Sequence, residues 1–513
     1  MNFTQAQDRY ITADYLLKNQ FTGGDYAREE TLTRVERYAG WTLPNIFPDD
    51  PLNEYDEMQN DYQSTGAQAV TNLANKIMMA LFQPSRPFFR MNLSQTQKTE
   101  IIEETDMNEA QIDAVLAEQE RAAMRELDKK NGRVVMNDVV QHLIIAGNSL
   151  LYMPEEGKMQ NYSLRDFTIK RDLRGDLVKV IIRETKAVVA LSEELAAIAM
   201  SEGYGEEDDV SLYTCIQRIN EKQYIVWQEL EDVCHCHKKV GLYNKDNLPW
   251  IPLTWNLTRN KDYGTGLVEN YSGDFHTLST LAEASLDYVT ILTDVKNLVD
   301  PTGMTNVREI TESPSGAYVH GREEDLYVHT PQVSNNASFI ENKEDKVERR
   351  IAAAFLLNTS VTRQAERVTA EEIRMQAQEL EGSLGGVYSR LALELQHPLA
   401  VRLLAKLHPM FKDIEPIIVT GLESLSRNSE LDRMRLFFQD LLSLSEVPEQ
   451  VADRIDYGNL IAVLGAGHGV DFGKILLPED VVKANQQAKA QAQAQAAGME
   501  AGAVAQAENQ GPQ

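Results

Sequence analysis

Cysteine is scarce in this chain of 513 residues, which contains only Cys215, Cys234 and Cys236. A number that is small and odd does not suit a disulfide framework, and it indicates free thiols in a reducing compartment. Long apolar runs are also missing: stretches such as residues 143–146 are broken within a few residues, so no membrane-spanning helix is predicted. The first ten residues contain neither a basic nor an apolar segment, and no export signal is expected.

Positive charge is in deficit. The chain has 50 Lys and Arg against 78 Asp and Glu, a net charge of −28. A protein that binds nucleic acid tightly over a broad surface needs an excess of basic residues to neutralise phosphates. The acidic composition therefore argues against tight, static DNA binding. With 42% hydrophobic and 25% charged residues the chain has a globular composition, and its length suggests roughly two to four domains.

The common enzyme motifs are lacking too. We find no GxxxxGK[ST] phosphate loop, no GxSxG nucleophile elbow, no HExxH zinc helix and no EF-hand loop. Gly264-Thr265-Gly266 lacks the third glycine of a dinucleotide loop and is interpreted as a turn. Cys234-His235-Cys236-His237 could suggest a metal, but alternate side chains of an extended segment face opposite ways, so a strand edge is the preferred interpretation. We therefore predict no catalytic residues, no metal and no cofactor.

Hydrophobic periodicity predicts an α+β fold that is mainly helical. Residues 64–83 carry apolar side chains at three-and-four spacing, typical of a helix. A second helical face runs from Met136 to Ile144 and should end at Gly147, with a strand over 149–153. From about 160 to 258 the period changes toward two, and residues 212–219 and 224–230 are predicted to form a hairpin.

A long helix with a packing seam is expected between residues 277 and 300, where Asp300-Pro301 ends the pattern. Over residues 278–299 it would be a rod of roughly 33 Å. A polar segment with short strands at 316–320 and 326–330 follows, and then a second helix over about 338–358, so that the chain leaves the main body and returns. The seam, with its alternating spacing of three and four, consists of Leu278, Leu281, Ser285, Tyr288, Leu292, Val295 and Val299.

The C-terminal third begins with a polar loop, residues 358–368, followed by a capping box at Thr369–Glu372. The helix that starts there should continue towards residue 407 and bend at its internal glycines and proline, Gly382, Gly385, Gly386 and Pro398. Further helices are expected over 416–480. The Ala- and Gln-rich residues 484–513 have no bulky apolar face, so they predict a frayed helix or a disordered tail.

One stretch departs from the acidic balance of the chain. Residues 337–369 contain six basic and five acidic residues. Such a stretch could contact a passing polyanion, or it could be a solvated helix with ion pairs such as Asp345 with Arg349. Its basic residues are Lys343, Lys346 and Arg350 on one helical face, Arg349 beside them, and Arg363 and Arg367 in the loop.

Several segments together resemble the portal, or head-to-tail connector, of short-tailed bacteriophages with an autographivirus-type head. The similarity extends over most of residues 30–480. It is carried by Tyr38-Ala-Gly-Trp-Thr-Leu-Pro-Asn-Ile-Phe-Pro48, Gly66-Ala-Gln-Ala-Val-Thr-Asn-Leu-Ala-Asn-Lys-Ile-Met-Met-Ala-Leu-Phe82, Ile145-Ala-Gly-Asn-Ser-Leu-Leu-Tyr-Met-Pro154, Glu366-Arg-Val-Thr-Ala-Glu-Glu-Ile-Arg374, Leu384-Gly-Gly-Val-Tyr388 and Glu394-Leu-Gln396.

The resemblance implies a ring of twelve copies around an axial channel at one capsid vertex. It divides each copy into a wing, a stem, a clip, a tunnel loop and a crown. These parts would be the wing over 1–276, stem helices over 277–300 and 337–357, the clip over 301–336, the tunnel loop over 358–369, a long kinked helix returning to the wing over 370–415, the crown over 416–480 and an Ala/Gln-rich tail over 481–513.

The function implied by the resemblance is structural. The ring would nucleate head assembly, pass double-stranded DNA during packaging and ejection, and dock first the terminase packaging motor and then the tail adaptor. It would also contact the major capsid protein and the scaffolding and internal core proteins, as a virion component assembled in the host bacterial cytoplasm. In this context Lys343, Lys346, Arg350, Arg363 and Arg367 are expected to face the channel, and the seam is expected to pack against neighbouring subunits.

Two other classes of function stay open from the residues alone. One is an enzyme of the packaging machine, such as its motor or nuclease, against which the missing phosphate loop argues. The other is a tail or scaffold interaction protein without a bore.

Overall fold

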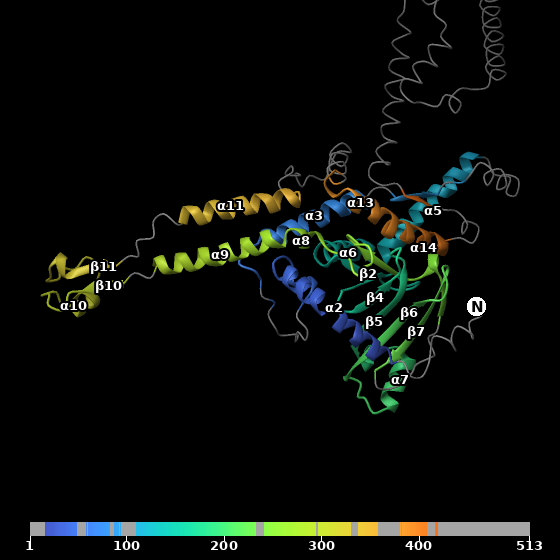
Figure 1. Cartoon of the computed structure of the whole chain (residues 1–513), viewed down its shortest axis with the longest axis horizontal. Helices are drawn as coiled ribbons and strands as arrows, with labels where there is room; N and C mark the ends of the chain where they lie inside the picture. The colour runs from blue at the N-terminus through green and yellow to red at the C-terminus, as the bar shows by residue number, and fades with distance from the viewer. Residues whose placement is uncertain are drawn as a thin grey trace, which may run out of the picture. The chain divides into compact units, whose positions relative to one another are not determined.

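The computed structural model describes residues 16–48, 58, 60–82, 87–91, 93, 109–231, 241–293, 296–329, 337–357, 380, 382–407 and 416–418. Within these ranges the fold is α+β, as predicted (Figure 1). The tunnel loop, the expected capping box, nearly all of the expected crown, the C-terminal tail and the Cys234–His237 cluster lie outside the described residues.

A five-stranded antiparallel sheet forms the β-rich part of the body. Its order is β4-β5-β6-β7-β8, and the predicted hairpin is confirmed as β6 and β7, with Leu212 opposite Leu230. The buried Cys215 thiol on β6 has its pKa raised to about 12 by burial, so it stays protonated. The strands are β4 (Phe167–Arg171), β5 (Leu177–Ala187), β6 (Asp209–Arg218), β7 (Gln223–Leu230) and β8 (Gly241–Asn244).

Helix α2 (Leu17–Gly40) packs across this sheet. Leu17 and Phe21 are buried against Ile181, Tyr213 and other side chains of β5, β6 and β7. The buried Arg28 guanidinium donates hydrogen bonds to the carbonyl oxygens of Leu164 and Phe167, and its charge is paired with Asp25 at 2.6 Å. Helix α7 (Glu193–Ser201) follows a short 3-10 turn and packs against the ends of β6 and β7 in a separate small cluster.

Two predicted helices form the centre of the main core. The expected helix over 64–83 is α3 (Thr65–Leu81), and the expected second helix is α6 (Gly132–Ala146), with α5 (Glu109–Lys129) before it. The strand that follows is β2 (Asn148–Tyr152), paired antiparallel with β3 (Gln160–Tyr162) and β9 (Trp250–Thr254).

Gly147 ends α6 in the left-handed conformation, with φ at +71°, as predicted. A Cβ atom at this position would lie 2.3 Å from the backbone carbon of Thr265, so glycine is needed for close approach as well as for its dihedral angle. The Asn148 side chain accepts a hydrogen bond from the Gly264 amide at 2.8 Å and donates one to the Gly264 carbonyl at 2.9 Å. Gly264-Thr265-Gly266 packs on the end of α6, but the predicted turn is wrong there: Thr265 forms an isolated antiparallel bridge with Asn256, so the segment is extended.

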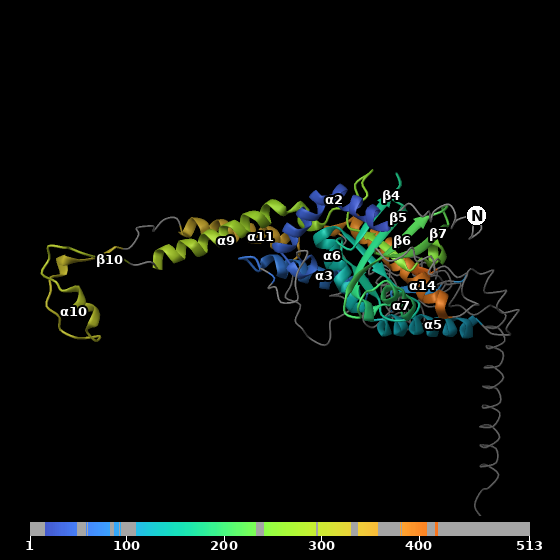
Figure 2. The ribbon, with the colours of Figure 1, turned by 90° about the horizontal axis from the view of Figure 1, so that it is seen from below.

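A pair of long helices carries the chain out of the body and back. They are α9 (Ser272–Thr293) and α11 (Ala337–Ala354), which lie side by side in both views (Figures 1 and 2). Asp274 at the start of α9 pairs with Arg350 near the end of α11, so the two helices are antiparallel.

The prediction of one helix over 277–300 is wrong at both ends. Helix α9 begins at Ser272 and ends at Thr293, and residues 296–299 form strand β10 (Lys296–Val299), paired antiparallel with β11 (Leu326–His329). The expected strand at 326–330 is thus confirmed as β11. The expected strand at 316–320 is a turn followed by irregular chain. Between β10 and β11 lie a short α-helix, α10 (Val307–Glu312), and a 3-10 turn (Glu323–Asp325).

The described part of the long C-terminal helix is interrupted, as its glycines indicated. Gly385 has φ at +51° and precedes α13 (Gly386–Leu391), which continues through a π-helical turn (Ala392–Gln396) into α14 (His397–Leu407). The described strand β12 (Pro416–Ile418) pairs antiparallel with β1 (Phe89–Met91).

Candidate functional site

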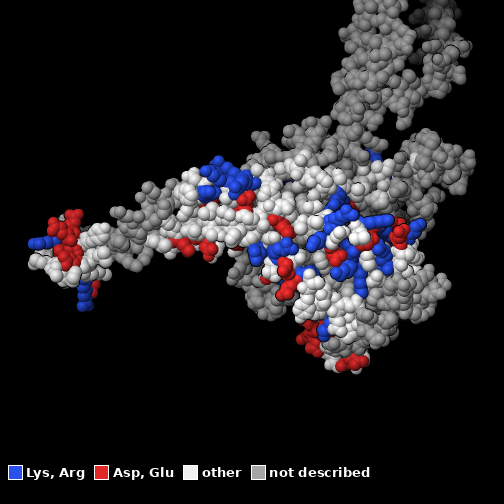
Figure 3. All heavy atoms as spheres, viewed as in Figure 1, with Lys and Arg blue, Asp and Glu red and all other residues white. Residues whose placement is uncertain are grey.

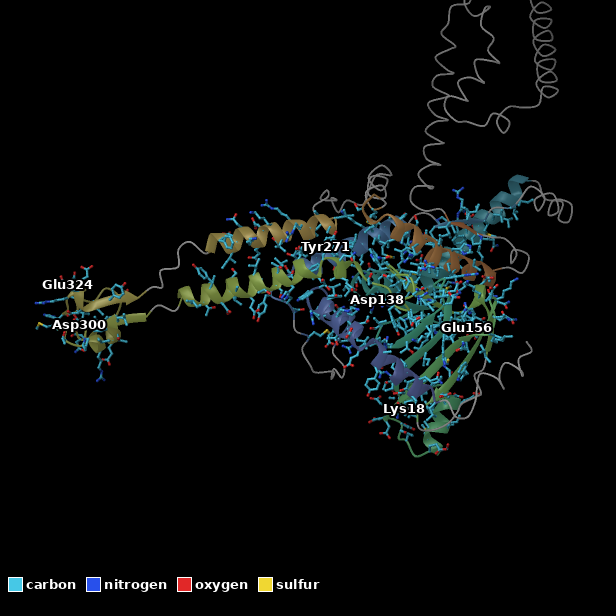
Figure 4. The ribbon with its side chains drawn as sticks, in the orientation of Figure 1. Lys18, Asp138, Glu156, Tyr271, Asp300 and Glu324 are labelled. Atoms are coloured by element: carbon cyan, nitrogen blue, oxygen red, sulfur yellow. The ribbon has the colours of Figure 1, made fainter. Side chains whose placement is uncertain are left out.

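The base of the helix pair is a cluster of aromatic side chains. Phe355, fully buried, packs edge-on against Phe275 with ring centres 5.6 Å apart and against Tyr271 at 5.9 Å. Figure 4 labels Tyr271 where α8 (Leu267–Asn270) gives way to α9. Leu278 of α9 and Ile351 of α11 are buried in the same core. The pair is therefore rooted in the body by aromatic and aliphatic packing.

Phe355→Ala is expected to lower the free energy of unfolding by about 3–5 kcal/mol, because it removes a fully buried ring and leaves a cavity. Chemical unfolding of the full chain measures the loss. Phe339→Ala makes the same change near the start of α11, at a side chain that is 64% exposed, and it should cost less than about 0.5 kcal/mol. Equal losses for the two variants would contradict this packing.

The exit of α11 is fixed by polar contacts from α3. The Leu356 carbonyl accepts hydrogen bonds from Lys76 Nζ at 2.6 Å and Asn72 Nδ2 at 3.1 Å, and Leu356 itself has φ at +56°. Thr65 Oγ1 donates to Glu348 Oε1 at 2.5 Å. These bonds set where the chain leaves towards residues 358–369. We did not predict them, although a lysine within the apolar stripe of residues 69–80 was a visible signal.

Helix α11 separates its charges onto two flanks. At about 100° per residue, its basic side chains span an arc of roughly 120° and its acidic side chains a different arc of roughly 100°, with Val347 and Ile351 buried between the two arcs. The basic arc comprises Lys343, Lys346, Arg349 and Arg350, and the acidic arc comprises Glu341, Glu344, Asp345 and Glu348. Burial, and then the neighbouring carboxylates, raise the pKa of Glu344.

The predicted basic residues of α11 are exposed, but they are not equivalent. Arg350 Nη2 donates to Asp274 Oδ1 at 2.6 Å, so its charge is engaged inside the chain. Lys343 lies 6.0 Å from the ring centre of Phe339, and Lys346 has no ion pair with any described residue. Arg349 pairs with Asp345 at 3.4 Å, the contact expected of a solvated helix. Arg363 and Arg367 lie outside the described residues.

Figure 3 shows the Lys and Arg side chains of α11 as one patch. Helix α9 beside it carries three acidic residues, Asp274, Glu283 and Asp287, and no Lys or Arg. The helix pair therefore presents a basic flank on α11 and an acidic one on α9.

The predicted seam on α9 turns largely towards the chain itself. Leu278 is buried in the core of its own chain, while Leu281, Ser285 and Tyr288 are half-buried. Leu292 is on the helix, its side chain outside the described set, Val295 is not described, and Val299 lies on β10. The exposed apolar residues of α9 are instead Leu286, Val289 and Ile291, each more than half exposed. These three were not predicted, although all are apolar.

The segment from β10 to β11 is held together by one carboxylate, that of Asp325. Asp325 Oδ2 accepts hydrogen bonds from the Met304 amide, the Thr305 amide and the Thr305 hydroxyl, at 2.9, 3.1 and 2.8 Å. These bonds fix the loop after β10 against the turn before β11, where Figure 4 labels Asp300 and Glu324. Two hydrogen bonds from Thr302 lower the pKa of Asp300.

Asp325→Ala should open this loop, because it removes the acceptor of three hydrogen bonds and leaves two buried or half-buried amides without a partner. Exchange of the Met304 and Thr305 amides with deuterium should accelerate by about 10- to 100-fold, because the free energy of opening this loop should fall by about 1.5–3 kcal/mol. Asp325→Asn keeps an acceptor oxygen and should give a smaller change. Unchanged exchange in the alanine variant would rule out this role for Asp325.

Among the described residues, no group of three or more His, Cys, Asp or Glu side chains is placed to hold a metal ion. No described helix is long and apolar enough to cross a bilayer.

Comparison with known proteins identifies the family. The family model for bacteriophage head to tail connecting proteins matches residues 16–476. The chain belongs to this family. It is 34% identical over 468 residues to the portal protein of Enterobacteria phage T3, covering 88% of this chain and 86% of the relative. It is 33% identical to the portal protein of Escherichia phage T7, covering 94% and 91%, and 32% identical to that of Pseudomonas phage phiKMV, covering 88% and 90%.

Membership of the connector family gives the chain its role. It joins the phage head to the tail, and it serves packaging and ejection of the genome as a virion component at a capsid vertex. The matched relatives are portal proteins, and the comparisons indicate no family of enzymes.

Proposed function

We propose that twelve copies of this chain form a closed ring with an axial channel, in which α9 and α11 are the stem. The observation that carries the proposal is that α9 has exposed apolar side chains on both sides of its core-facing stripe: Leu286 and Val289 on one side and Ile291 on the other, each 52–56% exposed. A helix that is apolar beyond its core-facing stripe is typical of one that a neighbouring surface covers. In a ring, each stem would pack on the stem of the next copy through a heterologous, closing contact.

The remaining parts follow the order of the chain. The sheet and helices up to residue 276 form the wing, the β10–α10–β11 unit lies within the clip, and residues 358–369 form the tunnel loop. The helix over 370–415 returns to the wing, where residues 416–418 pair with β1 instead of starting the crown. The residues after them, up to 480, form the crown, and residues 481–513 extend into the head. The connection of Lys76 and Asn72 to Leu356 supports a defined starting point for the tunnel loop.

The channel wall is acidic with a few basic rows. A net charge of −28 per copy keeps phosphates from adhering, while Lys343 and Lys346, repeated by symmetry, centre the duplex. Arg363 and Arg367 would add a second row. Arg350 contributes less, since Asp274 neutralises it within the chain.

The partners of the ring would be the terminase motor and then the tail adaptor at the clip, and the major capsid, scaffolding and internal core proteins at the wing and crown. The ring would assemble in the host bacterial cytoplasm, take no cofactor and catalyse no reaction. Neither a tail adaptor without a bore nor an enzyme of the packaging machine is favoured by any observation.

Phage particles made without this chain test the proposal. Heads lacking it should contain no genome, and chain supplied from a plasmid should restore filling. Purified chain mixed with duplex DNA should hydrolyse no ATP above background. Heads that fill and deliver DNA without the chain would overturn the proposal, as would DNA-stimulated hydrolysis that copurifies with it.

A further inference from the structure

A cavity of about 370 Å³ lies between the wing sheets and the returning helix. Its wall comes from the turn between β4 and β5, from β9 with the chain just before it, and from the π-helical turn and α14. Apolar side chains such as Leu177, Leu248 and Val401 line much of it. No step of the proposed DNA passage uses this cavity.

Two residues of its wall have buried donor atoms without an acceptor. Nε and Nη1 of Arg402 and the indole Nε1 of Trp250 have no hydrogen-bond partner among the described residues. The Trp250 ring is held in place by stacking on Tyr152, with ring centres 4.9 Å apart, and by an edge contact with Tyr243. Leaving such groups unpaired costs free energy, so donors from two separate elements in one wall indicate a ligand with acceptor oxygens.

The charge of Arg402 is not neutralised within the described residues. Burial lowers the pKa of Arg402 to about 9, which still leaves it a cation at neutral pH, and the charge of Asp246 acts in the opposite direction without an ion pair. The other charged groups of the wall are engaged. Lys245 pairs with Asp176 at 2.9 Å, Glu394 lies 3.8 Å from Arg390, and Arg171 donates to the Gly175 carbonyl at 2.8 Å.

The rim of the cavity suits a polypeptide. Leu393 is 69% exposed there, so an apolar side chain at the rim lies beside a tryptophan and an arginine whose Nε and Nη1 are buried. This combination is characteristic of the energetically important centre of a protein interface. Duplex DNA is instead contacted by exposed Lys and Arg, and a narrow apolar cavity does not suit its phosphates. The carboxylate of an acidic side chain can accept hydrogen bonds from Arg402 and Trp250 and can neutralise the charge of Arg402.

We propose that this cavity receives a carboxylate of the neighbouring copy, with Arg402 and Trp250 as its donors. The inference rests on the proposed ring. A second copy is the occupant because each copy carries a surplus of 28 acidic over basic residues, so its surface complements a buried cation. In a heterologous ring contact, the cavity of each subunit would meet a different patch of the next.

Arg402→Met in the full chain tests this inference through two properties: the stability of the subunit against denaturant and the stability of the ring against dilution. If the arginine had no partner in the ring, its removal would relieve an unpaired buried charge and weaken nothing. If it binds the carboxylate of a neighbour, the subunit should unfold at the same or a higher denaturant concentration, while the ring should dissociate at a protein concentration about tenfold higher or more. Arg259→Met makes the same change at an exposed turn position that does not line the cavity, and it should alter neither property.

Sedimentation velocity across a dilution series measures ring dissociation. Wild-type rings that form and are no more stable than Arg402→Met rings would overturn this inference and leave the ring standing. A wild-type chain that forms no ring at any concentration would overturn both.

A photo-crosslinker tests the occupant directly. With p-benzoylphenylalanine in place of Leu393, irradiated rings should give a covalent dimer of the chain on a denaturing gel. The same substitution at Val189, which is 69% exposed and does not line the cavity, is the control and should give markedly less. Equal yields from the two positions would contradict a neighbouring copy seated at this cavity.

Discussion

Leu286→Asp should convert the ring into separate subunits. Leu286 is 56% exposed in the single chain, so the substitution should leave folding intact. In the ring, by contrast, it would place a carboxylate without a partner in the contact between neighbouring stems. Burying an isolated carboxylate costs several kcal/mol, and a closed ring repeats the cost at every interface. We expect ring yield to fall by at least about 100-fold, measured by size-exclusion chromatography with light scattering.

The matched control is Leu286→Met, which conserves volume and apolar character and should keep nearly full ring yield. Unfolding curves of the aspartate variant should match those of the wild-type subunit. Normal rings from Leu286→Asp would show that this face of α9 is in solvent and that the stems pack in another way.

Lys343→Glu combined with Lys346→Glu should leave rings intact and reduce the DNA that heads retain. The pair changes the charge of each copy by −4, and symmetry places that change around the whole channel. Rows of like charge alter the local concentration of a polyanion by a factor of about 10 or more, so we expect roughly tenfold fewer DNA-filled heads. Arg350 is left unchanged, because its pair with Asp274 joins α11 to α9.

Nuclease-protected DNA per head, assayed after expression of the double variant, measures retention. Lys343→Arg with Lys346→Arg keeps the charge and should behave as wild type. The deficit should shrink with increasing salt, since screening weakens exposed charges. A double glutamate variant that packages and retains full-length genomes would remove these residues from the channel.

The sequence predicted most of the body because its pattern there is unambiguous. Helices α3 and α6 have a strong three-and-four apolar spacing. Gly147 ends α6 in a conformation and a close contact that a residue with a Cβ atom could not adopt. The β6–β7 hairpin follows from alternating β-branched and aromatic residues. Local pattern and tertiary packing agree in all of these elements.

The helix over 277–300 was predicted with the wrong bounds because the spacing of the seam continues past the true end. Residues 296–299 contain apolar positions that suit a strand as well as a helix, and pairing with Leu326–His329 decides for the strand. No local pattern can show a partner almost 30 residues away. The failure at residues 316–320 is similar, since a short apolar run forms a strand only if an edge is there to pair with it.

The candidate site was predicted in part. Charge counting found the basic residues of α11, but it could not show that Arg350 is paired with Asp274 across 76 positions of sequence. Nor could it separate the α9 residues that pack on α11 from Leu286, Val289 and Ile291, because all are apolar. Arg402 was missed entirely, since an unpaired donor is visible only after its surroundings are folded.

Electron cryomicroscopy of the purified full-length chain tests the central claim most directly. We predict top views of a closed ring with an open axial hole, in which the basic flank of α11 faces the hole and Leu286 faces the next subunit. Single chains at every protein concentration, or an assembly without a hole, would contradict the account.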